Sequence, residues 1–128
     1  MFNSILAISI GASIGAVGRW LLGLWLNSVL THFPLGTLIA NLLGGYLIGV
    51  AFALFANHPS WPAEWRLLIM TGFLGGLTTF SSFSLEVTQL LLHQQKVLWA
   101  SAVIMFHVIG SLVMTLLGMM TVGLFKNI

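Results

Sequence analysis

Four long apolar stretches, separated by three short polar segments, make up nearly all of the chain. They cover residues 4–30, 35–56, 67–92 and 97–124. A helix needs about 20 apolar residues to cross the hydrocarbon core of a bilayer, and each stretch reaches this length. Prolines and polar residues mark the intervening segments as short loops. The pattern predicts an all-α membrane protein, in which residues 1–128 form a single transmembrane domain of four membrane-spanning helices.

The third apolar stretch contains a cluster of glycine and hydroxyl residues at residues 71–86. Glycine costs about 1 kcal/mol relative to alanine within a helix, and serine and threonine side chains compete for backbone hydrogen bonds. We therefore expect the third helix to be broken near its middle, between Gly75 and Thr79. Backbone groups freed at membrane depth persist only where they line a cavity, bind an ion or meet protein. The break is therefore a candidate functional element.

Two phenylalanines follow the expected break, and three serines surround them at positions 81, 82 and 84. Phe80 and Phe83 are three residues apart, so they share a helix face. The edge of an aromatic ring is electropositive and can attract a small anion without a formal charge. The spacing is also typical of phenylalanines that pack in a core or face lipid, so packing and a polar pathway are both open interpretations.

Two polar side chains interrupt the first and second stretches. An arginine at the centre of a lone membrane helix costs roughly 2.5–3.5 kcal/mol. We therefore expect Arg19 either to face water or protein and attract anions, or to reach the membrane interface beside Trp20 and Trp25. The amide of Asn41 supplies two donors, which suit a neutral anion site and equally an interhelical hydrogen bond.

Three polar residues of the fourth stretch, His107, Ser111 and Thr115, follow one another at steps of four. This spacing puts them on one stripe of a helix. One such residue would be typical of helix packing, whereas three in register predict one wall of a polar track. We interpret His107 as a neutral side chain that is hydrogen-bonded within the bundle.

Composition excludes several classes of function. Charged residues are 5% of the chain, against about 25% in a soluble domain, so the chain cannot cover a water-facing surface. The net charge of +2 rests on four basic and two acidic residues, which is too sparse for a nucleic-acid partner. The chain has no cysteine, which excludes disulfides and thiolate metal sites. No nucleophile–base pair or catalytic carboxylate pair is evident, so we do not expect an enzyme.

The basic residues give almost no bias in membrane orientation. Lys and Arg in short flanking segments set that orientation. Arg66 and Lys126 fall on the side shared by the N-terminus, the second loop and the C-terminus, and Lys96 falls on the other side. Such a chain can insert both ways round and pair antiparallel, which gives two chains the symmetry of an inverted repeat. A single orientation is the alternative, because the counts are small.

Residues 72–86, GFLGGLTTFSSFSLE, resemble the signature of the Fluc family of bacterial fluoride channels. The match is long and free of gaps, and the resemblance extends over essentially the whole chain. It implies an antiparallel, dual-topology homodimer of four-helix subunits in the bacterial inner membrane. It also implies two pores along the subunit interfaces, through which fluoride leaves passively and the cytoplasmic fluoride concentration falls.

The resemblance further implies roles for individual residues. Backbone carbonyls of Gly75 and Thr78 from both subunits would hold a central, structural sodium ion. The residues that would line the fluoride pore are Asn41, Phe80, Phe83, Ser111 and Thr115. Further candidates for the vestibule or the polar track are Arg19, Ser81, Ser84, Glu86 and His107.

Two positions depart from the pattern of the family that the chain resembles. Many members carry a second arginine where Trp25 stands, so the contribution of that charge is lost or replaced here. Members often carry a smaller polar residue where His107 stands, which leaves its role less defined.

A small proton-coupled multidrug exporter is the alternative function, because it also has four helices and can adopt both orientations. It would need a membrane-embedded carboxylate, and Glu86 is the only acidic residue inside a predicted span. A third possibility is an assembly factor that transports nothing. Such a protein would account for the glycines but not for the polar stripes.

Overall fold

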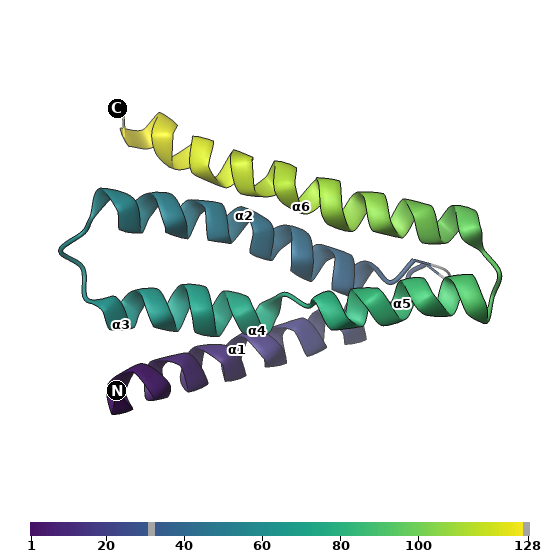
Figure 1. The fold of residues 1–128 in the computed structure, drawn as a ribbon, viewed down its shortest axis with the longest axis horizontal. Helices are drawn as coiled ribbons and strands as arrows, with labels where there is room; N and C mark the ends of the chain where they lie inside the picture. The colour runs from purple at the N-terminus through teal and green to yellow at the C-terminus, as the bar shows by residue number, and fades with distance from the viewer. Residues whose placement is uncertain (31–32, 127–128) are drawn as a thin grey trace.

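The computed structural model describes residues 1–30 and 33–126, and this part of the chain contains helices and no strands. Four helical spans in it are long and apolar enough to cross a membrane. The prediction of an all-helical fold with four spans is therefore confirmed. Three spans are single helices (Figure 1), namely α1 (Phe2–Leu26), α2 (Leu35–Asn57) and α6 (Val97–Lys126). The third span is divided into α3 (Ala63–Arg66), the π-helical segment η1 (Leu67–Leu74), α4 (Gly75–Leu77) and α5 (Phe80–Leu92).

The first helix ends earlier than its apolar pattern indicates. It ends at Leu26, whereas the pattern continues to residue 30. The Asn27 side chain explains this end, because its Oδ1 accepts a hydrogen bond from the backbone nitrogen of Gly36 at 2.7 Å and so ties α1 to the start of α2. The third span begins at Ala63, after Pro62, since proline is tolerated where a helix starts. Residues 31–32 of the first predicted loop lie outside the described residues.

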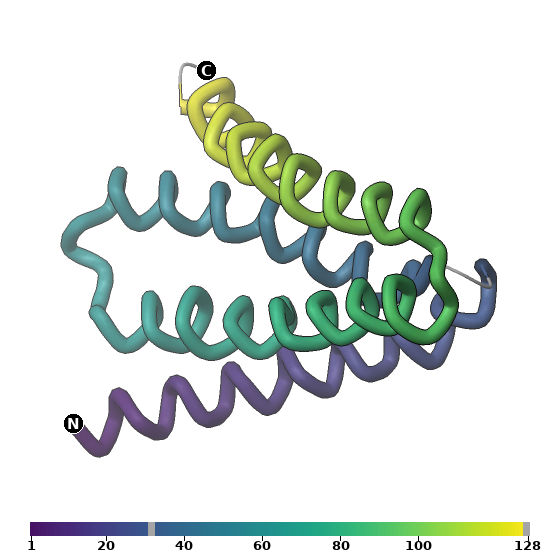
Figure 2. Tube along the Cα trace, turned by 45° about the vertical axis from the view of Figure 1, so that its right-hand side comes forward, coloured from purple at the N-terminus to yellow at the C-terminus, as the bar shows by residue number. Residues whose placement is uncertain are grey.

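The helices pack as two pairs that lie side by side. Figures 1 and 2 show α6 along α2, and α1 along the third span. Glycines allow each pair to approach closely. A Cβ atom at Gly15 would strike the backbone of Phe73 and Leu77 in the third span, and one at Gly49 would strike the backbone of Thr115 in α6. Both contacts follow the small-residue rule for helix pairs in membranes.

The third span is broken where its composition predicts. Thr78 (φ −88°, ψ 155°) and Thr79 (φ −151°, ψ 117°) have extended backbones between two helical segments. Thr79 then caps the start of α5, since its hydroxyl accepts a hydrogen bond from the backbone nitrogen of Ser82 at 3.1 Å. A threonine in this position satisfies one of the free N–H groups of the new helix. The expected break is confirmed, and it is centred on the threonine pair.

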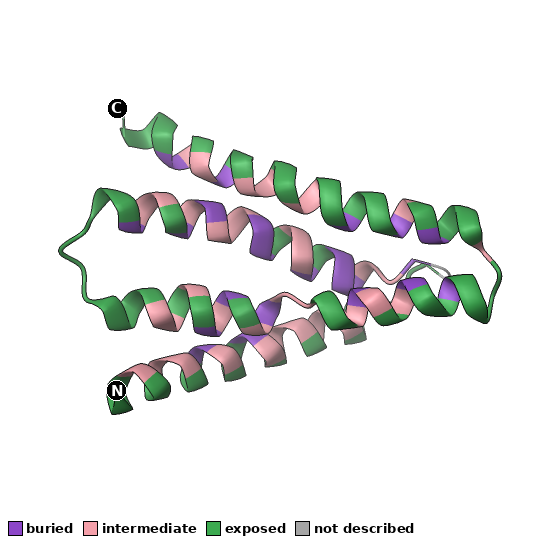
Figure 3. Cartoon of the chain, viewed as in Figure 1, coloured by how far each residue is buried: buried purple, intermediate pink, exposed green. Residues whose placement is uncertain are grey.

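About half of the described residues are exposed on the single subunit (Figure 3), and many of these are large and apolar. In water such a surface would be unstable, whereas in a membrane it faces hydrocarbon. Both termini and the loop between α2 and α3 lie at one end of the bundle (Figure 1). The buried apolar residues form two clusters. One contains Phe33, Leu38, Phe83, Val87, Leu90, Ala100 and Val103, and the other contains Ala40, Ala51, Phe55, Leu74 and Leu77.

Candidate functional site

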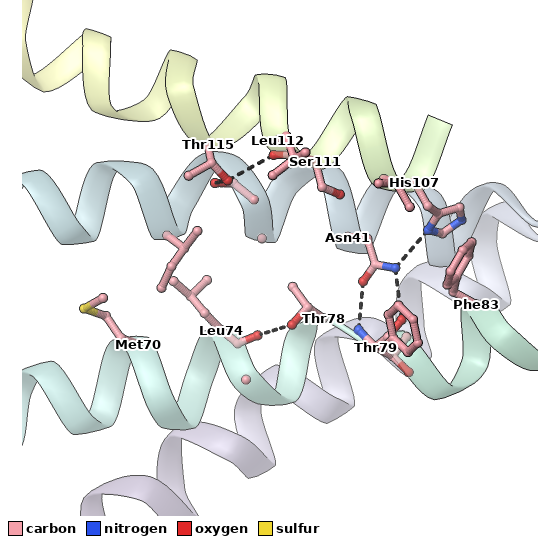
Figure 4. A pocket seen from close by; sticks show the side chains of 16 residues that line it. Asn41, Met70, Leu74, Thr78, Thr79, Phe83, His107, Ser111, Leu112 and Thr115 are labelled. Carbon is pink, nitrogen blue, oxygen red and sulfur yellow. Dashed lines mark hydrogen bonds between the residues drawn. The ribbon is translucent and has the colours of Figure 1, made fainter. Parts of the chain in front are cut away.

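A cavity of about 490 Å³ lies between the α2–α6 pair and the third span, and the helix break forms part of its wall (Figure 4). Its lining is mainly apolar, with a small number of polar side chains. That combination is typical of sites that bind a small species and orient it. The apolar part of the wall includes Ile48, Met70, Leu74, Val108 and Leu112.

Most of the residues selected from the sequence meet at this cavity. The four that do not line it are Arg19, Ser81, Ser84 and Glu86. The eight that do are Asn41, Gly75, Thr78, Phe80, Phe83, His107, Ser111 and Thr115.

Asn41 holds the helix break by pairing with one residue of it. Its amide nitrogen donates to the carbonyl oxygen of Thr79 at 3.0 Å, and its Oδ1 accepts from the backbone nitrogen of Thr79 at 2.7 Å. Both main-chain groups of an extended residue are thus satisfied by one side chain, which an apolar environment requires. The same amide nitrogen also bonds to His107 Nδ1 at 2.9 Å (Figure 4). Both hydrogens of the Asn41 amide are therefore engaged within the subunit.

His107 is buried and is hydrogen-bonded within the bundle, as its position in the sequence indicates. Because the Asn41 amide is the donor, His107 Nδ1 accepts, and a neutral imidazole then carries its proton on Nε2. The Nε2 atom is buried and has no partner within residues 1–30 and 33–126. The ring packs against Phe83, with 4.7 Å between the centroids. His107 therefore fixes both the amide and the inner phenylalanine.

The two phenylalanines after the break differ in burial. Phe83 is 8% exposed and packs inside the subunit, whereas Phe80 is 76% exposed. Their ring centroids lie 5.3 Å apart in an edge-to-face arrangement, which suits the charge distribution of aromatic rings. The Phe83 ring therefore lies in the packed interior, whereas the Phe80 ring projects from the subunit at the mouth of the cavity.

The break frees the carbonyls of Gly75 and Thr78 from their usual helical donors. In a continuous helix these carbonyls would accept from the backbone nitrogens four residues later, at Thr79 and Ser82. Those nitrogens donate instead to Asn41 Oδ1 and to Thr79 Oγ1. The hydroxyl of Thr78 is occupied by the carbonyl of Leu74 at 2.8 Å. The hydrogen of the Thr78 hydroxyl is thus used within the helix, while the Thr78 main-chain carbonyl has lost its usual helical donor.

Arg19 is half-buried and contacts the break directly. Its Nε donates to the carbonyl oxygen of Gly76 at 3.2 Å. A cation is favourable at this place because Gly76 lies in the last helical turn before the break, where helix carbonyls give a negative potential. The sequence left Arg19 between an anion-attracting role and a position at the interface. The contact with the Gly76 carbonyl means that Arg19 faces protein here, which the first interpretation allowed.

The hydroxyl groups near the cavity differ in whether they already form hydrogen bonds. The Thr115 hydroxyl faces two main-chain carbonyls, of Gly45 at 2.9 Å and Ser111 at 3.0 Å. The Ser111 hydroxyl has no hydrogen-bond partner within the described residues and lines the cavity. Ser81 lies 3.3 Å from the Thr79 hydroxyl. Of the fourth-span stripe, Ser111 thus offers the donor that is least committed.

Glu86 lies outside the cavity wall but close to the same corner of the bundle. Its Oε1 accepts a hydrogen bond from the Thr37 hydroxyl at 2.6 Å. Its Oε2 is buried without a partner among the residues that the structure describes. A carboxyl group within a membrane helix needs such a partner, and Thr37 supplies it. Thr37 was not singled out in the sequence, because a lone threonine in an apolar helix gives no distinctive pattern.

Within the described ranges, no group of three or more His, Asp and Glu side chains lies close enough to hold a metal ion. Oxygens of the main chain are therefore the candidate ligands for a cation at the break. Carbonyl oxygens are ligands that suit hard cations, so the diverted carbonyls of Gly75 and Thr78 fit this requirement.

Thr79 is the main residue that sequence reasoning did not assign to the site. It provides the cap of α5 and both backbone groups that Asn41 holds. A signal for the cap was present, since a threonine followed by a helix-compatible run is a common helix start. No local pattern indicates the pairing with Asn41, which is 38 residues away in the chain.

Comparison with known proteins gives consistent matches over nearly the whole chain. The family described as CrcB-like protein, Camphor Resistance (CrcB), matches residues 6–119. A protein of Tolumonas auensis named fluoride-specific ion channel FluC is 64% identical over 127 residues, which cover 99% of both chains. A protein of Pseudomonas aeruginosa with the same name is 58% identical over 96% of both chains. One from Chromobacterium violaceum, also so named, is 60% identical over 92% of this chain and 93% of its own. The chain therefore belongs to the CrcB family.

Proposed function

We propose that this protein is a channel that lets fluoride leave the cell passively across the inner membrane of a bacterium. The observation that carries the proposal is the cavity at the helix break, where aromatic rings, an amide and uncharged hydroxyls meet without a formal charge. Relatives at up to 64% identity carry the name fluoride-specific ion channel FluC.

The lining accounts for how a small anion would pass. Fluoride would exchange part of its water shell for the ring edge of Phe80, the hydroxyl of Ser111 and neighbouring donors. Uncharged contacts bind the anion strongly enough to let it enter and weakly enough to let it leave. The Asn41 amide has both hydrogens engaged within the subunit, so we assign it first to holding Thr79 in the pore wall.

Ion efflux from liposomes tests the function. Purified protein should release fluoride without a proton gradient, while chloride stays inside. Uptake of a cationic drug driven by a pH gradient, without fluoride leak, would instead support the exporter. Neither activity would contradict both proposals and favour a scaffold that transports nothing.

We further propose that two subunits pair antiparallel and form the pores between them. Phe80 projects from the subunit and the cavity opens at its surface, so a second copy would complete the wall. The weak charge bias supports insertion in both orientations. α3, which ends at Arg66, and the end of α6, which carries Lys126, lie at one end of the bundle, whereas the α5–α6 loop, which carries Lys96, lies at the other (Figure 1).

Several lysines added to the loop at Gln94 and Gln95 should force one orientation and abolish fluoride efflux. The reason is that positive charge in short loops keeps them on the cytoplasmic side, so antiparallel partners would no longer form. Co-expression with a variant biased the other way should restore efflux. Normal conduction by the single biased variant would contradict antiparallel pairing.

We also propose that a sodium ion is held where two broken helices cross, by the carbonyls of Gly75 and Thr78 from both subunits. The diversion of their helical donors to Asn41 and Thr79 supports this choice of ligands. Fluoride efflux should fall after prolonged removal of sodium, and lithium or potassium should not replace it equally. Thr78→Ala should change sodium dependence little, because the proposed ligand is the main-chain carbonyl, which alanine keeps.

Gly75→Ala tests the proposed contact between subunits without disturbing the packing within one subunit. A Cβ at Gly75 meets only the carbonyl oxygen of Met70, at 3.9 Å, so the subunit has room for it. We expect Gly75→Ala to fold but to lose sodium-dependent efflux, since the added methyl group would face the ion and the partner. Gly76→Ala is the matched comparison, because its Cβ would lie 3.0 Å from Ala12 Cα and should destabilise the subunit itself. Efflux of Gly75→Ala at the parental rate would contradict a close crossing at this residue.

A further inference from the structure

A second cavity lies at the end of the bundle, away from the helix break. It has a volume of about 260 Å³ and is lined by Phe55, Trp61, Pro62, Trp65 and Ile69. Phe55 comes from the last turns of α2, and the other four come from the α2–α3 loop and the start of the third span. Because these spans end here, the cavity lies at the level where a membrane helix meets the headgroups, with Ile69 toward the hydrocarbon.

The aromatic rings of this cavity hold one another in place. Phe55 and Trp61 meet edge to face, with centroids 5.5 Å apart. The His58 ring stacks on the Trp61 ring, with 4.1 Å between the centroids. Phe55 is 5% exposed, whereas Trp65 is 56% exposed. The cavity is therefore a built apolar recess with a fixed floor and an open side.

A cation stands at the rim of the recess. The Arg66 guanidinium lies over the Phe55 ring, 5.5 Å from its centroid. It forms no ion pair with any acidic side chain of residues 1–30 and 33–126. A contact with an aromatic ring uses none of the five guanidinium N–H donors in a hydrogen bond, so they remain available for a bidentate acceptor. The geometry thus combines an apolar slot with an adjacent unpaired cation.

A second positive charge lies at the same end of the bundle as Arg66. Lys126 lies at this end, with its ammonium 3.4 Å from Asn57 Oδ1 at the end of α2. Glu64 is the one acidic side chain of the α2–α3 loop and α3. The local excess of positive charge favours an anionic headgroup over a neutral one.

We propose that this recess binds one anionic phospholipid, with an acyl chain in the aromatic slot and the phosphate on Arg66. Water is a poor occupant, because the lining offers few polar partners and a buried water needs two to four. Hydrocarbon satisfies such a lining without any polar contact. Arginine pairs with phosphate through charge-assisted, bidentate hydrogen bonds. The acyl chain therefore suits the apolar slot, and the phosphate suits the Arg66 guanidinium.

Native mass spectrometry of the purified full-length protein tests the proposal with two probes of identical acyl chains, phosphatidylglycerol and phosphatidylcholine. The parental protein should retain phosphatidylglycerol preferentially. Arg66→Gln should weaken that retention about tenfold, the usual scale for a lost charge-assisted hydrogen bond, and should remove the preference. Ile69→Trp should reduce retention of both lipids, because the larger side chain fills the slot.

Lys96→Gln is the matched control, since it removes one positive charge from the opposite end of the bundle. It should leave the lipid preference unchanged, and gel filtration should show that all three variants keep the parental assembly. Unchanged retention of phosphatidylglycerol by Arg66→Gln would overturn the proposal. It would also be overturned if Ile69→Trp altered the assembly and not the lipid retention, because the recess would then be covered by a second copy of the chain.

Discussion

Replacing Phe80 by isoleucine is expected to stop fluoride efflux from liposomes while leaving the subunit folded. Phe80 is 76% exposed on the single subunit, so its ring contributes little to the packed core. Apolar exchanges of similar size usually cost less than about 1.5 kcal/mol even in a core. Isoleucine keeps the bulk but lacks the electropositive ring edge, so an anion would meet hydrocarbon with no replacement for its water. Methionine should be milder, because its polarizable thioether adapts to its neighbours.

The matched control is Phe52→Ile, which changes an exposed phenylalanine of α2 that does not line the cavity. Efflux by this variant should equal the parental rate. Phe83→Ile is a less clean test, since Phe83 is 8% exposed and packs against His107. Assembly should be checked by gel filtration in each case. If a folded Phe80→Ile protein released fluoride at the parental rate, the Phe80 ring would contribute packing and no contact to the anion.

Asn41→Leu is expected to destabilise the protein strongly, because it removes both hydrogen bonds that this side chain makes to Thr79 inside the membrane span. The Thr79 carbonyl, at the N-cap of α5, still accepts the first hydrogen bond of that helix, whereas the Thr79 amide loses its acceptor. An unsatisfied backbone group costs about 1–3 kcal/mol, so the free energy of unfolding should fall by about that amount. Denaturant titration in detergent measures this change, and the recovery of assembled protein should fall with it.

Asn41→Asp gives an intermediate comparison, because it keeps the acceptor for the Thr79 amide and loses the donor to the Thr79 carbonyl. Asn57→Leu is the control for changing an asparagine on the same helix, since Asn57 is exposed at the end of α2. Such a surface exchange should stay within about 0.5 kcal/mol of the parental stability. Equal stability of Asn41→Leu and Asn57→Leu would mean that Asn41 does not support the break.

The sequence predicts the four spans and the break because both depend on composition and local backbone preference. Apolar length sets the spans, and the glycines and threonines near Gly75 weaken one helix at one place. The end of α1 was placed too late because its apolar pattern continues past Leu26. The helix ends there because the Asn27 side chain bonds to Gly36, a tertiary contact that hydropathy does not contain.

The sequence selects eight residues that the structure brings to one cavity, but it does not give their hydrogen-bond partners. His107, Ser111 and Thr115 share a stripe because helical periodicity is regular, and the structure brings all three to the cavity. The partners of Asn41 and Arg19 could not be derived in the same way. Each contact joins separate helices, Asn41 to Thr79 and Arg19 to Gly76, and depends on how the helices pack. A polar residue in an apolar helix predicts that a partner exists but not which one.

The break in the third span also has a consequence for the order in which the protein is made. A broken helix entering lipid alone would expose the carbonyl of Gly76 and the amide of Thr79. Their partners, Arg19 in α1 and Asn41 in α2, both precede the break in the chain. A ribosome that delivers the helices in sequence therefore presents both partners before the segment that needs them. The break can thus be neutralised as it arrives, without waiting for α6 or for a second subunit.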